Sequence, residues 1–69
     1  MMMGERITKR LGELRMTQRE LAATVGVTEI TMSRYIRGSR TPNAVVIANI
    51  AKALGVTTDY LLGLDEQII

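Results

Sequence analysis

The sequence predicts a small all-α fold of five helices, and three observations support this. Apolar residues recur at spacings of three and four, as on one face of a helix, and no stretch alternates as a strand would. Three threonines each follow an apolar residue and precede a second one by four positions, the pattern of an N-cap with a hydrophobic staple. They are Thr17, Thr28 and Thr57. Helix-ending residues stand where the periodic patterns stop, namely Gly26, Pro42, Gly55 and Gly63.

The first helix is expected over residues 5–14, where Ile7, Leu11 and Leu14 share one face. Gly12 weakens its last turn, because glycine in a helix interior costs about 1 kcal/mol relative to alanine. No structure is expected for Met1, Met2 and Met3.

Residues 17–38 are predicted to form two short helices joined by a turn at Gly26. The first spans residues 18–25 and opens on a capping box of Thr17 and Glu20. The second is capped by Thr28 and runs to about Arg37, with Met32 and Ile36 expected to face inward. Helices 2 and 3 therefore have the layout of a helix-turn-helix, in which the second helix enters the major groove of DNA.

The remaining chain is expected to add two helices. Asn43 or Thr41 caps the fourth, residues 44–54, which is apolar nearly all round and is therefore expected to be the central buried element. The fifth covers about residues 58–62, and residues 64–69 form a C-terminal tail. We expect one domain over residues 1–69, with its core at about 5–63.

Composition argues against enzymes and metal sites. The 69-residue chain has no His and no Cys, so the usual general base, the thiol nucleophile and the commonest metal ligands are missing. The carboxylates form no convincing catalytic pair. We therefore expect no enzyme, no cofactor and no metal, and no apolar run is long enough to cross a membrane. The absence of Cys suits the cytoplasm.

Charge is distributed unevenly along the chain. The net charge is only +2, but residues 5–40 carry eight basic and four acidic side chains, a net of +4. Residues 41–69 carry one basic and three acidic side chains, a net of −2. The positive charge therefore gathers on the half that contains the helix-turn-helix, as a phosphate-binding face requires.

Residues 6–63 resemble the phage-repressor/Cro helix-turn-helix family, also called the xenobiotic-response-element type. The resemblance is carried by Thr-Gln-x-Glu-Leu-Ala at 17–22, Gly26-Val27-Thr28, Ser33-Arg34, Arg37-Gly38, Pro42, Ile50-Ala51-Lys52-Ala53-Leu54-Gly55-Val56 and Tyr60-Leu61-Leu62. It implies a lambda-repressor-like DNA-binding domain that binds double-stranded DNA sequence-specifically, as a homodimer on a palindromic operator. It further implies a transcriptional regulator, a repressor in our interpretation, encoded by a bacterium or phage and located with the DNA of the cytoplasm. One departure is Arg15, where family members often carry Gly or Asn.

The phase of the third helix predicts which side chains read bases. With Met32 inward and 100° per residue, Ile30 and Arg34 lie near the opposite side, as does Arg37. Arg34 fits the acceptors of guanine, or else binds phosphate or water, and Ile30 fits a thymine methyl group or is a lone surface residue. Glu29 either accepts from cytosine or, the favoured alternative, complements the helix dipole. The full set of base-reading candidates is Thr28, Glu29, Ile30, Thr31, Ser33 and Arg34.

A second set of residues is expected to bind phosphates. Free amides at the start of the second helix favour anions, and the resemblance adds side chains on either side of the third helix. The candidates are Thr17, Gln18, Arg19, Arg37, Ser39, Arg40 and Asn43. Any single Arg among them could simply be solvated.

Apolar residues in segment 60–69 either cover a homodimer seam or close the end of the monomer. They are Tyr60, Leu61, Leu62, Leu64, Ile68 and Ile69, of which Leu61 is expected in the core. The alternative function is a protein-interaction module, of the antitoxin or anti-repressor type, on the same fold. A basic and polar outward face on the third helix favours DNA, whereas a broad apolar face would favour protein.

Overall fold

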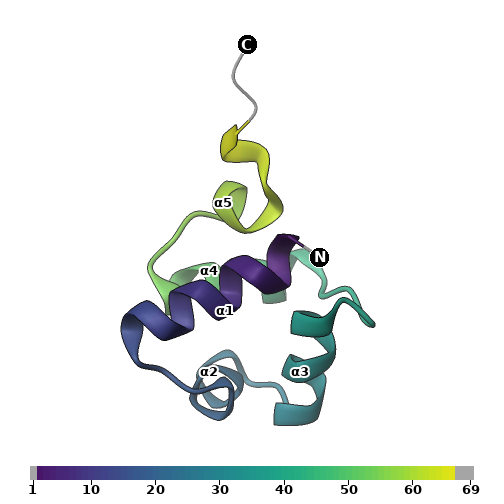
Figure 1. Ribbon diagram of the computed structural model, residues 1–69. Coiled ribbons are helices and arrows are strands. Elements are labelled where there is room, and N and C mark those ends of the chain that lie inside the picture. The colour runs from purple at the N-terminus through teal and green to yellow at the C-terminus, as the bar shows by residue number, and fades with distance from the viewer. Residues whose placement is uncertain (1, 67–69) are drawn as a thin grey trace.

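The computed structural model describes residues 2–66, without the side chains of Met2 and Glu66, and confirms five α-helices. They are α1 (Met2–Leu14), α2 (Gln18–Val25), α3 (Glu29–Arg37), α4 (Ala44–Leu54) and α5 (Thr58–Leu62), followed by a 3₁₀ turn, η1 (Leu64–Glu66). Figure 1 shows α2 and α3 at one end of the molecule and α5 with η1 at the other. Residues 1 and 67–69 lie outside the described part.

The predicted N-caps are confirmed by their hydrogen bonds. The Thr17, Thr28 and Thr57 hydroxyls each accept from the backbone amide three residues later, at 3.0–3.1 Å. Asn43, rather than Thr41, caps α4 in the same way, at 2.9 Å from the Val46 amide. The apolar residue before each threonine packs against the core, and its partner four residues after the cap is fully buried. The helix starts follow from local chemistry.

The first helix begins at Met2, not at Glu5, so the expectation of no structure is wrong for Met2 and Met3, while Met1 lies outside the described residues. Met3 is buried, and Gly4 lies against the backbone of Ile36 in α3. This tertiary contact extends α1 beyond the turn that its own sequence pattern marks. Leu14, by contrast, was expected on the core face and is 38% exposed, because α1 ends there and the chain turns into α2.

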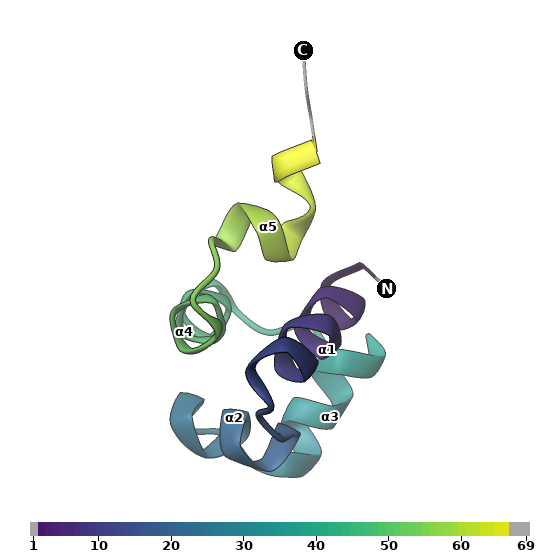
Figure 2. The same cartoon turned by 60° about the vertical axis from the view of Figure 1, so that its left-hand side comes forward.

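The expectation that α4 is the central buried helix is wrong in its burial. Ile50, Ala51 and Leu54 are buried, but Val45 in its first turn is 69% exposed. Helices α1 and α4 each pack against three others, α1 against α3, α4 and α5 (Figure 2) and α4 against α1, α2 and α5. An apolar sequence does not bury a helix all round when only a few neighbours are available to cover it.

Two arginines on one face of α1 donate hydrogen bonds to carbonyl groups near the C-terminal ends of α4 and α5. Arg10 donates from Nε to the Leu54 carbonyl at 2.8 Å, and Arg6 donates to the Tyr60 carbonyl. Arg6 also lies over the Tyr60 ring and pairs with Asp65 at 2.6 Å. Terminal carbonyls of a helix lack partners within it, so these contacts satisfy the ends of α4 and α5 and join η1 to α1.

Candidate nucleic-acid interface

The packing of α3 decides which of its sides is open. Met32 is fully buried and Tyr35 nearly so, while Ile36 is half-buried against the core. On the opposite side, Ile30 is 65% exposed and Arg34 and Arg37 are exposed. The orientation expected from helical periodicity is therefore confirmed.

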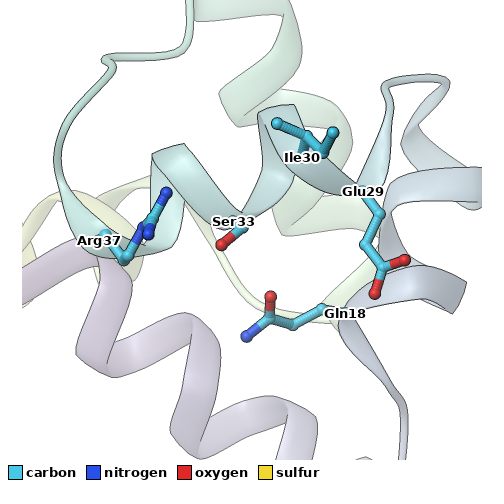
Figure 3. A pocket seen from close by; sticks show the side chains of 5 residues that line it. All are labelled: Gln18, Glu29, Ile30, Ser33 and Arg37. Atoms are coloured by element: carbon cyan, nitrogen blue, oxygen red, sulfur yellow. The ribbon is translucent and has the colours of Figure 1, made fainter.

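Figure 3 shows a shallow hollow between α3 and the start of α2. It measures about 300 Å³ and is lined by Gln18, Glu29, Ile30, Ser33 and Arg37. Two expected phosphate contacts, Gln18 and Arg37, thus share a surface with three expected base readers. Gln18 comes from α2, so the phase of α3 could not reveal this grouping. Arg34 lies outside the hollow.

The first turn of α3 is partly engaged within the protein. The Thr28 hydroxyl accepts from the Thr31 amide and donates to the Thr31 hydroxyl at 2.9 Å. Glu29 pairs with Arg19 of α2, with 3.5 Å between the Arg Nε and the carboxylate. In Figure 3 its carboxylate lies on the side of Gln18. Both partners are exposed, so this ion pair adds at most about 1 kcal/mol to stability.

The start of α2 offers free backbone donors. The Thr17 amide is taken by the Glu20 carboxylate at 2.9 Å, which completes the capping box. This bond and the one from the Thr17 hydroxyl lower the pKa of Glu20 below its ordinary value of 4.5. The amides of Gln18 and Arg19 have no partner within the helix, because the first turn lacks preceding carbonyls. They carry the positive end of the α2 dipole.

The remaining expected phosphate contacts lie in the connection between α3 and α4. Arg40 is exposed there, and the Ser39 hydroxyl lies 3.4 Å from the Arg34 carbonyl. Asn43 uses its side-chain oxygen to cap α4, which leaves its amide nitrogen as a donor. Exposed cations therefore border α3 at both ends, with Arg19 near its start and Arg37 and Arg40 near its end.

A second hollow, of about 560 Å³, opens between α1 and the end of α3. Its lining includes Thr8 and Lys9 of α1, and Arg37 belongs to both hollows. Sequence reasoning assigned no role to Thr8 or Lys9. The only signal was their place on the exposed face of α1, and which helix that face meets depends on packing.

Within residues 2–66, no group of three or more Asp and Glu side chains is placed to hold a metal ion. None of the described helices combines the length and the apolar character that a membrane crossing requires.

The sequence matches a known family model and is similar to known proteins. A family model described as helix-turn-helix matches residues 7–61. The chain is 38% identical over 61 residues to repressor protein C2 of Salmonella phage P22, covering 88% of this chain and 28% of that protein. It is 32% identical over 66 residues to the transcriptional regulator ImmR of Bacillus subtilis, covering 96% of this chain and 52% of that protein. The chain thus spans about half or less of the length of these relatives.

Two solved structures are similar over most of their length. The solution structure of the DNA-binding domain of the P22 C2 repressor has a TM-score of 0.84 and 37% identity, covering 90% of this chain and 82% of that one. The crystal structure of the P22 C2 repressor in complex with a synthetic operator has a TM-score of 0.82 and 36% identity, covering 88% and 92%.

Proposed function

Because the chain belongs to the helix-turn-helix family of phage repressors and Cro proteins, we propose that it is a sequence-specific, double-stranded DNA-binding transcriptional regulator. We propose that it acts as a repressor and reads the major groove with α3. The observation that carries this proposal is the open side of α3, where Ile30 and Arg34 are exposed opposite the buried Met32. A similar structure was determined with an operator, which supports DNA as the ligand.

Base reading falls to the outward side of α3. Arg34 presents a fork of donors that fits O6 and N7 of guanine, and Ile30 presents a methyl surface that fits the thymine methyl group. Ser33 shares the hollow with Ile30, so its hydroxyl is available to a neighbouring base or phosphate. Thr28, Glu29 and Thr31 complete the set, although their contacts within the protein must yield or be shared when DNA binds.

Phosphate binding supplies register rather than sequence information. Thr17, Gln18 and Arg19 contribute from the start of α2, and Ser39, Arg40 and Asn43 from the connection after α3. Arg37, the last residue of α3, is a further phosphate-binding candidate between the start of α2 and the connection after α3. Two positively charged borders suit a helix that lies in a groove flanked by two phosphate strands.

A dimer on a palindromic operator follows from the two-fold geometry that this motif uses on DNA. Segment 60–69 is the proposed seam. Leu62 and Leu64 are exposed there, whereas Leu61 is fully buried in the monomer and Tyr60 is half-buried. Ile68 and Ile69 lie outside the described residues. A regulator of bacterial or phage DNA works in the cytoplasm, which is the location we propose.

Other functions receive less support. A protein-interaction module calls for a broad apolar surface, but the outward side of α3 is polar and basic apart from Ile30. The relatives bear the names of a repressor and of transcriptional regulators, which supports binding rather than catalysis.

The test is selection of bound duplexes from a random pool, repeated at several salt concentrations. We expect one enriched palindrome. Arg34→Ala should relax the preference at one base pair in each half-site at a cost of about 1–3 kcal/mol, while Arg40→Ala should weaken binding to all sequences alike. Lys52→Ala, which removes an exposed cation from the last turn of α4, is the control.

Two outcomes would contradict the proposal. Steep salt dependence without an enriched sequence would leave only non-specific binding. An Arg34→Ala variant with unchanged preference would remove Arg34 from the base-reading set.

A further inference from the structure

The end of α1 differs from the other four helix ends. Helices α2 to α5 each close on a glycine in the left-handed conformation, with φ between 68° and 86°. Helix α1 closes on Arg15, at φ 54°, the only non-glycine residue with positive φ in the described part of the chain. The Met16 amide donates to the Leu11 carbonyl at 2.9 Å, as the Val27 amide does to Ala22 after α2 at 3.0 Å. The same cap is therefore built with a residue that fits it poorly.

The Arg15 side chain makes no specific polar contact within the described part of the monomer. It is exposed, and within residues 2–66 it makes no side-chain hydrogen bond or ion pair. The nearby carboxylate of Glu13 pairs with Arg10 at 3.2 Å instead. Attraction to the negative end of the α1 dipole remains, but this is weak at an exposed, salt-screened site. The steric cost of the left-handed backbone is thus not offset by a specific contact inside the protein.

The position of Arg15 suggests where its charge is used. It stands two residues before Thr17, and the free amides of Gln18 and Arg19 follow in the first turn of α2. Figure 2 shows the short connection from α1 running directly into α2. Arg19 adds a second exposed cation at the same helix start. A phosphate bound to these amides would lie within reach of a long, unpaired guanidinium at position 15.

We propose that Arg15 is a further phosphate-contacting residue, which extends the α2 phosphate site into the connection after α1. An arginine at this position costs stability, because the left-handed backbone conformation there favours glycine. This inference rests on the proposed DNA-binding function. Its signature is that replacing Arg15 by glycine raises the stability of the fold and lowers the affinity for DNA.

The experiment compares Arg15→Gly, Arg15→Lys and Lys52→Ala with the unmodified chain. Arg15→Gly should melt about 4–8 °C higher without DNA, because glycine relieves the left-handed strain. At temperatures where all variants are folded, it should bind every duplex roughly five- to tenfold more weakly at low salt. Its slope of log K against log salt should be less steep by about 0.9 per protomer. Arg15→Lys should keep the slope and melting temperature, and Lys52→Ala should keep the slope.

The outcomes separate the inference from the function on which it rests. Equal affinity and slope for Arg15→Gly and the unmodified chain would overturn the role of Arg15 while operator selection by the unmodified chain still stood. Failure of the unmodified chain to select any duplex would overturn the proposed function itself. A lower melting temperature for Arg15→Gly would overturn the claim that position 15 is strained.

Discussion

At the scale of single residues, two glycines in α1 have opposite consequences. Gly4 is buried where α1 meets α3, and a Cβ built on it would lie 1.8 Å from the Ile36 carbonyl oxygen. Gly12 is exposed, and a Cβ there would meet nothing within 4 Å. Gly4 therefore permits a close approach of two helix backbones, whereas Gly12 only weakens the helix that contains it.

We predict that Gly4→Ala destabilises the fold by about 1–3 kcal/mol, because the added methyl group must push α1 and α3 apart. Gly12→Ala should instead stabilise it by about 0.5–1 kcal/mol, because alanine is the better helix former and has free space there. Urea unfolding measures both. The two variants make the same chemical change in the same helix, so equal effects would contradict the close approach at Ile36.

At the scale of secondary-structure elements, the helix starts depend on capping chemistry. The box of Thr17 and Glu20 has both of its hydrogen bonds, at 2.9 and 3.1 Å. The bond from the Thr17 amide, together with a bond from the Thr17 hydroxyl to the carboxylate, lowers the pKa of Glu20. In the unfolded chain these bonds are lost and the carboxyl regains its ordinary pKa, so the start of α2 couples stability to pH.

We predict that the ionised Glu20 stabilises the fold above pH 4.5 and that this contribution is lost as the pH falls through the lowered pKa. The sign follows because, in that window, the unfolded state binds more protons than the folded state. Glu20→Gln keeps an acceptor for the Thr17 amide but does not titrate, so its unfolding free energy should depend less steeply on pH between about pH 5 and pH 3. A pH dependence identical to that of the unmodified chain would contradict this assignment.

At the scale of the whole molecule, the helix pair that carries the proposed interface lies at one end and the proposed dimer seam at the other (Figure 1). Leu62 and Leu64, 48% and 45% exposed, are held beside α1 by the contacts of Arg6 with Tyr60 and Asp65. Val45 on α4 is more exposed than either, at 69%, but lies outside this segment. It therefore provides a matched control for the role of segment 60–69.

We predict that the double variant Leu62→Gln, Leu64→Gln folds and binds a single half-site normally but loses cooperative binding to the full palindrome. The reason is that both side chains are exposed in the monomer and become buried only in the proposed seam. Val45→Gln should bind the palindrome like the unmodified chain. Titration of half-site and palindromic duplexes measures the difference, and retained cooperativity in the double variant would place the seam elsewhere.

The sequence alone determined the features that depend on neighbours within one helical turn. The threonine caps, the glycine stops of α2, α4 and α5 and the buried side of α3 were predictable, because capping bonds span three residues and helical phase repeats every 3.6. The residue that ends α3, however, is Gly38 and not the expected Pro42. Tertiary structure alone decided that α1 extends to Met2 against α3, that α4 leaves Val45 exposed, and that Gln18 joins Ile30, Ser33 and Arg37 around one hollow. These features depend on which helix faces contact each other, and those contacts result from close packing between residues that are distant in the chain.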